Sequence, residues 1–413
     1  MTELTTKGKI AKKSALQIID CLEKINPALE KMADALEQNS PYIIEENAKD
    51  MKAAKENNMT KSLQDRLLLN TERIAHIALG LRQVAALPSP LGKIQHKEDR
   101  PNGLKIERIS VPLGVVGIIY ESRPNVTADA SALCLKSGNA VILRGGKESI
   151  NSNVAIVKIL TEAAMEAGLP EGCIQLIEDT SRESSIGLMK LNSYLDVIIP
   201  RGGVGLKKAV MENATVPFIE TGAGNCHVYV DFSADLKMAE AIVVNSKTTR
   251  PSVCNSAEKL LVHEKIAEKF LPNVLKSLAD KGVRLKGCGQ TRKIYPQAEE
   301  MPDTEWGHEY LDMIMGIKVV TDVNEAITHI NEYSSKHSEA IVTETPENGE
   351  KFLSHIDSSS VYLNASTRFT DGFEFGLGAE MGISTQKIHA RGPMGLEQLT
   401  SAKYVIRGSG QIR

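Results

Sequence analysis

The sequence predicts an α/β protein with two parallel-sheet domains and a small additional hairpin. Between residues 115 and 364, short apolar runs alternate with stretches of helical period. Strands that alternate with helices are joined by right-handed crossovers and form parallel sheets. The chain has 413 residues, which is more than one hydrophobic core usually serves. Two α/β domains therefore account for its length.

The composition excludes several classes of partner. Forty-nine basic and 52 acidic side chains give a formal charge of −3, and no basic cluster with interleaved aromatics occurs, so we expect no nucleic-acid or membrane partner. The six cysteines form no Cys-x-x-Cys pair, which argues against a disulfide framework or a metal site. No apolar run is long enough to span a membrane. We expect a cytoplasmic protein without a metal.

The chain outside the α/β units predicts a helical arm and a hairpin. From residue 14 to about 87, apolar residues recur every three or four positions, with a break at 39–41 and a new helix start at 70–72. Residues 92–112 alternate in polarity around a turn, as a hairpin does. The segment 403–407 has the pattern of a strand.

Two strand ends in the first α/β unit carry residues suited to binding an anion. One is Arg144-Gly-Gly-Lys147, and the other contains Gly202 and Gly203 just before a predicted helix. Ligands of parallel sheets bind beyond the carboxyl ends of the strands. Glycines before a helix let backbone N–H groups approach an anion. Such residues are about as often a solvated basic turn and ordinary turn formers, so both interpretations stay open.

The second unit contains a candidate nucleophile, Cys254. It lies in a polar turn ahead of an apolar run, and Lys247 and Arg250 lie upstream, where a cation would favour the thiolate. Thirty-four residues earlier, Glu220 stands in the stretch Val-Pro-Phe-Ile-Glu-Thr-Gly-Ala-Gly-Asn. A cysteine chosen at random is more often buried and inert, so this role depends on the surrounding residues.

The pairing of Glu220 and Cys254 resembles the aldehyde dehydrogenase superfamily, in which a Glu-x-Gly segment at a strand end precedes the nucleophilic cysteine by a similar interval. Within it, the segments 320–341, 371–384 and 389–395 resemble the branch that reduces gamma-glutamyl phosphate. The resemblance covers nearly the whole chain.

This resemblance implies an aldehyde dehydrogenase-like fold with three parts. Residues 1–230 would form the helical arm and the NADP-binding domain, including the hairpin 92–112. Residues 231–385 would form the catalytic cysteine domain, and residues 386–413 a C-terminal return and oligomerisation strand. The hairpin and this strand would assemble a homo-oligomer.

The implied activity is the NADPH-dependent reduction of L-glutamyl 5-phosphate to L-glutamate 5-semialdehyde and phosphate, the second step of proline biosynthesis. Cys254 would form a thioester with the substrate. Glu220, which activates water in hydrolytic relatives, would here be turned away, or serve as a structural or proton-shuttling group. Glutamate 5-kinase is a possible partner that would supply the substrate.

The resemblance also implies roles for individual cofactor ligands. Relatives hold the adenosine ribose of the cofactor at the positions of Arg144 and Lys147. An acid there suits a free 2′-hydroxyl and a cation suits a 2′-phosphate, so these residues favour NADPH over NADH. Gly202 and Gly203 would approach the pyrophosphate. Asp312 falls where the superfamily has an acid that contacts the nicotinamide ribose.

Where oxidative members carry an asparagine as second oxyanion donor, this chain has Ser122. The substrate-binding candidates lie in that segment or near Cys254, and they are Ser122, Arg123, Asn125, Lys247, Arg250 and Ser252. A surface or turn role is about as probable for the last three. His329 and His337 lack a metal-ligand pattern and are interpreted as structural or loop-ordering groups.

Two alternative functions remain. An oxidative, hydrolytic aldehyde dehydrogenase would share the fold, but Ser122 and the cations near Cys254 count against it. A non-catalytic scaffold is disfavoured because Cys254, Glu220 and the cationic cofactor turn occur together.

Overall fold

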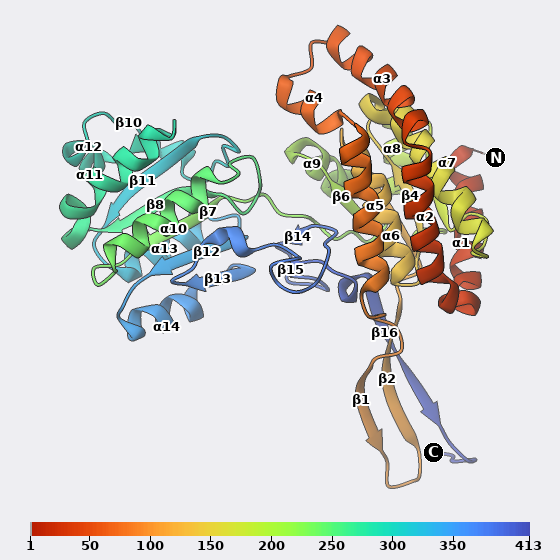
Figure 1. Cartoon of the computed structure of the whole chain (residues 1–413). Helices are drawn as coiled ribbons and strands as arrows, with labels where there is room; N and C mark the ends of the chain where they lie inside the picture. Colours follow the sequence, from red (N-terminus) through yellow and green to blue (C-terminus); the bar gives the residue numbers. More distant parts are fainter. Residues whose placement is uncertain (1) are drawn as a thin grey trace. The chain divides into compact units, whose positions relative to one another are not determined.

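The computed structural model describes residues 2–413, apart from the side chains of Ser62 and Val204, and divides them into two compact units (Figure 1). The first comprises the chain up to Glu220 with Leu377–Gly382 and Met394–Arg413, and the second comprises Thr221–Gly376 with Ile383–Pro393. The predicted boundaries, 230/231 and 385/386, differ from this division. Strand β7 joins the second sheet, and the C-terminal return is shared by both units.

The first unit begins with the predicted helical arm. Its helices are α1 (Glu3–Ile18), α2 (Ile25–Gln38), α3 (Ser40–Glu56), α4 (Lys61–Leu67) and α5 (Thr71–Ala86), with the 3₁₀ segment η1 (Ile19–Lys24) after α1. Both predicted interruptions are confirmed. Proline 41 lies in the first turn of α3, and the side chain of Asn70 caps α5 by accepting the N–H of Arg73.

The core of the first unit is a four-stranded parallel sheet in the order β5-β4-β3-β6. Its strands are β3 (Val115–Tyr120), β4 (Ala140–Arg144), β5 (Ile174–Leu176) and β6 (Val197–Arg201), and its helices are α6 (Pro124–Lys136), α7 (Ile150–Glu166), α8 (Arg182–Met189) and α9 (Val204–Asn213). The chain moves outward from β3 to β5 through α6 and α7 and returns to β6 through α8. Right-handed crossovers therefore place α8 on the face opposite α6 and α7.

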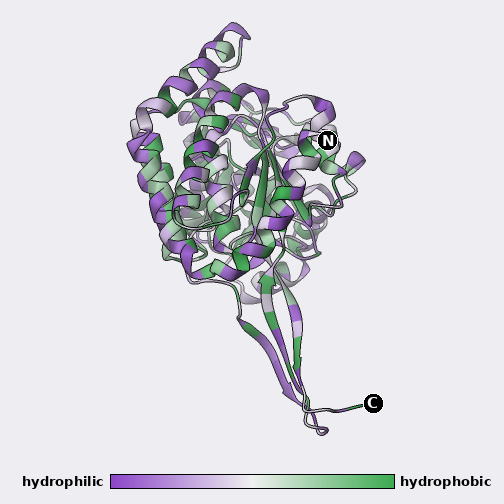
Figure 2. Ribbon diagram, turned by 90° about the vertical axis from the view of Figure 1, so that its right-hand side faces the viewer, coloured by the Kyte–Doolittle hydropathy of each residue, from purple (hydrophilic) through white to green (hydrophobic). Residues whose placement is uncertain are grey.

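A three-stranded antiparallel sheet belongs to the same unit. Its strands β1 (Ile94–Asp99) and β2 (Lys105–Pro112) form the predicted hairpin, and β16 (Thr400–Arg407) pairs with β2 over eight residues. Figure 2 shows that this sheet is mostly hydrophilic with isolated hydrophobic residues. The side chains of Ile94, Tyr404 and Ile406 in this sheet are more than half exposed. Both outer strands leave one edge unpaired within the chain.

The second unit is built on a seven-stranded, wholly parallel sheet in the order β10-β9-β11-β8-β7-β12-β13. Its strands are β7 (Cys226–Val230), β8 (Ala257–His263), β9 (Arg284–Gly287), β10 (Glu299–Glu300), β11 (Ile314–Val320), β12 (Ser338–Val342) and β13 (Ser360–Leu363). Its helices are α10 (Leu236–Thr248), α11 (Glu264–Asp280), α12 (Gly289–Ile294), α13 (Val323–Tyr333) and α14 (Pro346–His355). Because all seven strands run the same way, their amino ends share one edge.

Two hydrophobic cores cover the two faces of this sheet. Alternate strand residues such as Val228 and Leu260 pack with α10 and α11, whereas Tyr229 and Leu261 pack with α13 and α14. Because strand residues alternate between the two covered faces, residues 228–230 of β7 and 260–262 of β8 are all apolar. The predicted fold class, two parallel-sheet α/β domains with a hairpin, is thus confirmed.

Short elements complete both units. They are the strands β14 (Ile383–Ser384) and β15 (Gly392–Pro393), and the 3₁₀ segments η2 (Lys147–Ser149), η3 (Asp303–Glu305), η4 (Thr367–Phe369) and η5 (Glu397–Leu399). None of the helices described for residues 2–413 has the length and apolar character that a bilayer crossing requires.

Candidate active site

The Cys254 turn lies at the amino edge of the seven-stranded sheet. Helix α10 ends at Thr248, the chain turns, and β8 begins at Ala257. Cys254 is partly exposed, whereas four of the other five cysteines are buried, and none of the six forms a disulfide. The turn thus presents a thiol that a small molecule can reach, as a nucleophile requires.

The glycine-rich segment before β7 packs directly on this turn. The Cys254 carbonyl occupies the space beside Gly224, where an added Cβ would lie 1.5 Å from the carbonyl oxygen. Cys226, two residues further on, donates its S–H to the same oxygen at 3.1 Å. The N–H of Gly224 donates in turn to Glu309 at 2.6 Å. Only glycine fits at position 224, because backbone of the catalytic turn takes the place of a side chain.

A second loop, η4, is bound to the turn from the other side. The amide of Asn255 donates to the carbonyls of Arg368 and Thr370, at 3.3 Å and 2.9 Å, and the hydroxyl of Thr367 donates to the Asn255 carbonyl at 2.7 Å. These bonds fix the backbone of Arg368 beside the residue that follows Cys254. Sequence analysis did not identify Arg368 or Asn255.

The structure separates the cations predicted near Cys254. Arg250 is exposed and Ser252 is partly exposed, both between α10 and Cys254. Lys247 is completely buried, and its Nζ lies 3.3 Å from an oxygen of Glu258. Burial lowers the pKa of Lys247. Lys247 is therefore a structural residue of the core rather than an accessible phosphate ligand, which corrects that part of the prediction.

The burial of Lys247 follows from the length of α10. The helix continues to Thr248, and its buried positions are Ala239, Val243, Ser246 and Lys247. These positions follow helical spacing and form the face that packs on the sheet. The last turn of α10 therefore directs Lys247 inward, where Glu258 of β8 compensates its charge.

Neighbouring residues of β8 carry buried charges on opposite faces of the sheet. Beyond its contact with Lys247, Glu258 accepts the backbone N–H groups of Tyr310 and Leu311, both at 3.3 Å. Lys259 donates to the Asn225 side chain at 2.9 Å and to the His308 carbonyl at 2.7 Å. Burial raises the pKa of Glu258 and lowers that of Lys259. Together they hold the 308–311 loop against the amino edge.

Asp312 follows that loop and lies just before β11, which pairs with β8. It is exposed, and its carboxylate accepts the N–H of Met313 at 2.8 Å. Asp312 thus lies on the same edge of the sheet as the Cys254 turn. Its predicted contact with a nicotinamide ribose stays a prediction.

A buried acid and histidine link β7 and β12 next to the site. One oxygen of Glu339 accepts the backbone N–H of His227 at 2.7 Å and lies 3.0 Å from its ring Nδ1. Burial raises the pKa of Glu339 to about 8 and keeps that of His227 well below its ordinary value. His337 is buried at the start of β12, with Nδ1 2.8 Å from the hydroxyl of Ser338.

In the first unit, the predicted cofactor cations lie at the carboxyl end of β4. The guanidinium of Arg144 donates to the carbonyls of Thr180 and Ser181, at 2.7 Å and 2.9 Å, and its buried Nε has no hydrogen-bond partner. Burial lowers the pKa of Arg144. Lys147 is exposed at the start of η2. Arg144 ends β4 and Lys147 follows it, so both lie at the carboxyl edge, where parallel sheets bind ligands.

The glycine loop after β6 is occupied by a carboxylate. The N–H of Gly203 donates to Glu121 at 3.0 Å, and a Cβ at Gly202 would lie 2.7 Å from the Glu121 carboxyl carbon. Glu121 therefore holds the position where an anion would approach this loop. A pyrophosphate bound here would have to displace it.

Glu220 and the three substrate-binding candidates that follow β3 also belong to the first unit. Ser122 is buried, Arg123 is exposed at the N-cap of α6, and Asn125 donates to Asp129 at 2.9 Å. Burial raises the pKa of Asp129 to about 6. Glu220 is partly exposed and ends the first unit. Their roles in substrate binding and catalysis stay predictions.

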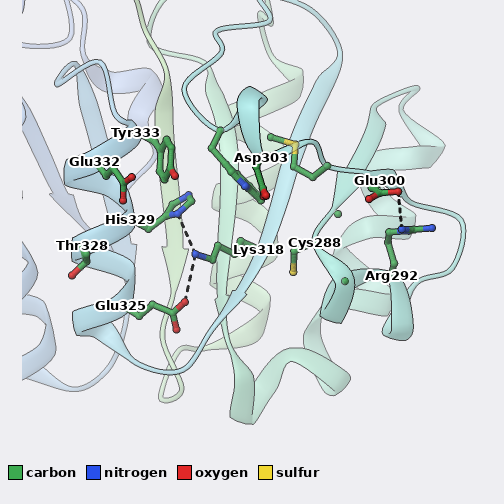
Figure 3. A pocket seen from close by; sticks show the side chains of 14 residues that line it. Cys288, Arg292, Glu300, Asp303, Lys318, Glu325, Thr328, His329, Glu332 and Tyr333 are labelled. Atoms are coloured by element: carbon green, nitrogen blue, oxygen red, sulfur yellow. Dashed lines mark hydrogen bonds and ion pairs between the residues drawn. The ribbon is translucent and has the colours of Figure 1, made fainter.

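A separate pocket of about 430 Å³ lies within the second unit, between α12 and α13 (Figure 3). Its cations are paired with carboxylates, since Lys318 lies 3.4 Å from Glu325 and Arg292 lies 3.4 Å from Glu300. His329 points toward Lys318, at 3.2 Å from its Nζ. Burial lowers the pKa of His329 to about 3. No cluster of three or more His, Cys, Asp or Glu side chains suited to a metal occurs in residues 2–413.

Comparison with known proteins agrees with this geometry. The model of the aldehyde dehydrogenase family matches residues 9–286, about two thirds of the chain. The chain belongs to the aldehyde dehydrogenase family. An acetylating aldehyde dehydrogenase from Geobacillus thermoglucosidasius, with 18% identity and a TM-score of 0.71, shares the fold over 100% of this chain and 97% of its own.

Within the family, the chain stands among the gamma-glutamyl phosphate reductases. It is 58% identical to that enzyme from Moorella thermoacetica, over 100% of this chain and 99% of the relative, and 57% identical to the Clostridium perfringens enzyme, with the same coverage. The crystal structure of the Thermotoga maritima gamma-glutamyl phosphate reductase superimposes with a TM-score of 0.98, at 48% identity and complete coverage of both chains. The resemblance predicted from the sequence is confirmed.

The close approach at Gly224 predicts an effect on stability. In Gly224→Ala the new methyl group would overlap the Cys254 carbonyl, and overpacking of this kind typically costs about 1–3 kcal/mol. We expect the melting temperature, followed by circular dichroism, to fall by several degrees. Gly289→Ala is the matched control, since no atom lies within 4 Å of its Cβ position. Equal melting temperatures for the two variants would contradict this account.

The raised pKa of Glu339 predicts that the stability of the protein depends on pH. Its pKa is about 8 in the folded chain against 4.5 ordinarily, so the folded state binds the extra proton between those values and loses stability as the pH rises. The lowered pKa of His227 has the opposite effect only below about 6.5. Between pH 6.5 and 8, Glu339 should therefore reduce the free energy of unfolding by about 2 kcal/mol.

Urea denaturation across that pH range tests this expectation. Glu339→Gln should show a shallower decline than the unaltered protein, because an amide does not titrate. Glu332→Gln, which changes an exposed acid on α13, should decline as the unaltered protein does. If Glu339→Gln follows the same curve, the carboxyl is not the group responsible.

Proposed function

We propose that this chain reduces L-glutamyl 5-phosphate to L-glutamate 5-semialdehyde and phosphate with NADPH, the second step of proline biosynthesis. The observation that carries the proposal is the Cys254 turn, which holds a reachable thiol at the amino edge of the sheet, four residues after the exposed Arg250. The relatives described above are gamma-glutamyl phosphate reductases over their whole length, which supports the same reaction.

Cys254 performs the first chemical step. Its thiolate attacks the γ-carbonyl carbon, a carbon–sulfur bond forms, and the bond to the phosphate oxygen breaks, leaving a thioester and free phosphate. The backbone N–H of Cys254 is the oxyanion donor we favour, and such a donor is typically worth about 3 kcal/mol. The contacts of Gly224 and Asn255 hold this backbone in place.

Most of the proposed cofactor ligands belong to the first unit. Arg144, whose Nε has no hydrogen-bond partner, and the exposed Lys147 fit a 2′-phosphate, because both present positive charge at the carboxyl end of β4. Gly202 and Gly203 would approach the pyrophosphate after displacement of Glu121, and Asp312 would contact the nicotinamide ribose. When bound, NADPH supplies the hydride that reduces the acyl group.

Substrate contacts and the role of Glu220 complete the mechanism. Ser122, Arg123 and Asn125 would orient the glutamyl moiety, and Ser252 would assist Arg250 at the phosphate. Glu220 is not required as a base in the reductive direction, because water must not cleave the thioester.

The sheet edges and the free cysteines support proposals for the oligomeric state and the cellular location of the protein. The unpaired edges and exposed apolar residues of the three-stranded sheet suit pairing with a second copy, so the chain would form a homo-oligomer. It would work in the cytoplasm, where its six free cysteines stay reduced. Glutamate 5-kinase, which makes acyl phosphates of this kind, is the partner that would supply the labile substrate.

The reverse reaction tests the proposal. With glutamate 5-semialdehyde, reduction of NADP should require inorganic phosphate, and Cys254→Ala should reduce the rate by at least about 10³-fold because no thioester can form. Cys288→Ala, which removes the other partly exposed cysteine, is the control and should stay active. NADP reduction without phosphate would instead indicate a hydrolytic dehydrogenase, and an active Cys254→Ala a non-catalytic thiol. Forward reduction that persists in Glu220→Gln would exclude the base role.

Cofactor preference provides a second prediction. Lys147→Glu should lower kcat/KM for NADPH relative to NADH by about 10- to 100-fold, the loss expected when a charged hydrogen bond is replaced by repulsion. Initial rates with each cofactor measure this ratio. Lys31→Glu, in the helical arm, should leave it unchanged. A constant ratio in Lys147→Glu would exclude Lys147 from the 2′-phosphate site.

A further inference from the structure

We infer that Arg368, together with Arg250, forms an anion subsite beside Cys254 that binds the phosphoryl group of the substrate and the inorganic phosphate that is released. This inference rests on the proposed function. It assigns a role to a residue that the sequence patterns did not single out.

Arg368 is held next to the nucleophile by backbone contacts. Its carbonyl accepts the amide of Asn255, the residue after Cys254, and the preceding residue, Thr367, donates to the Asn255 carbonyl. The N–H of Arg368 donates to the hydroxyl of Ser366, which begins η4. Arg368 therefore starts from a fixed point close to the reacting sulfur.

The guanidinium of Arg368 is partly buried and has no carboxylate ion pair in the described chain. Its buried Nε has no hydrogen-bond partner. Burial and the nearby charge of Arg250 lower the pKa of Arg368, whereas the Cys254 thiolate would raise it. Asp371 also lies nearby, but no ion pair joins it to Arg368. A partly buried guanidinium whose Nε has no hydrogen-bond partner can bind an external anion.

The pocket of Figure 3 provides the contrast within the same unit. There, Arg292 and Lys318 each have a carboxylate within 3.4 Å, so no unbalanced positive charge remains for a ligand. An arginine placed only for stability would be expected to be paired in the same way. Arg368, beside the Cys254 turn, is the exception.

The chemistry of the substrate decides which anionic group this subsite binds. In an acyl phosphate, one oxygen of the phosphoryl group is bonded to the carbonyl carbon that Cys254 attacks. The α-carboxylate is separated from that carbon by three carbon atoms. Cations beside Cys254 therefore meet the phosphoryl group. Neutralising its charge also stabilises phosphate as the leaving group, and a planar guanidinium can bind two of its oxygens at once.

Steady-state kinetics of the reverse reaction test this assignment. In Arg368→Gln the KM for phosphate should rise at least about tenfold, the loss typical of a charged hydrogen bond, while the KM for glutamate 5-semialdehyde changes less than about twofold. Arg368→Lys should restore part of the phosphate affinity because the charge returns. Arg292→Gln, which removes a paired cation from the Figure 3 pocket, should leave both KM values unchanged. A parallel rise in both values, or no rise for phosphate, would overturn the assignment.

Alkylation of Cys254 provides a readout that does not depend on turnover. Inorganic phosphate should slow modification of Cys254 by iodoacetamide in the unaltered protein, followed by mass spectrometry of the peptide, and should have no effect in Arg368→Gln. Phosphate protection that persists in Arg368→Gln would overturn the subsite. If the unaltered enzyme reduced NADP without phosphate but phosphate protection required Arg368, the proposed function would fail and the anion site would stand.

Discussion

The close contact between Gly224 and the carbonyl of Cys254 is the constraint on which the catalytic turn depends. A thiol at the end of a loop has no fixed position unless its backbone is held on more than one side. Here the glycine segment before β7 contacts the turn on one side, and η4 is bound to it through Asn255 on the other. The turn thus becomes part of the sheet edge, where backbone geometry is determined by β7 and β8.

Burial of charge at this edge carries a cost that the structure offsets locally. Lys247, Glu258 and Lys259 are completely excluded from solvent, and isolated charges there would be strongly unfavourable. Each has compensating partners, from the ion pair of Lys247 with Glu258 to the side chain of Asn225 and the carbonyl of His308 bound by Lys259. These bonds hold the 308–311 loop, which leads to Asp312 at the start of β11. Polar groups at the edge therefore stabilise the loops that surround the thiol.

The parts that the sequence predicted are those governed by local patterns. Apolar alternation, the capping of α5 by Asn70 and the first-turn position of Pro41 were sufficient for the element order. The spacing of Glu220 and Cys254 was sufficient for the family. What the sequence did not predict depends on contacts between distant segments.

Lys247 and Glu121 show what local sequence patterns could not predict. Lys247 was interpreted as a substrate ligand because it precedes Cys254 by seven residues, but whether it faces inward depends on how far α10 continues and on Glu258 being opposite. The consecutive charges of Glu258 and Lys259 within an apolar run were a usable sign of a buried polar cluster. Glu121 gave no such sign, because only the tertiary structure brings its carboxylate to the N–H of Gly203.

A reductase of this class must favour attack by the thiol and delay attack by water. In the proposed subsite, Arg250 and Arg368 would favour the thiolate and a departing phosphate, and neither group can take a proton from water. Within the second unit, Glu309 beside the turn accepts the N–H of Gly224. Glu220, the acid that activates water in hydrolytic relatives, belongs to the first unit. The nucleophile and the acid that activates water in hydrolytic relatives therefore come from different units of this chain.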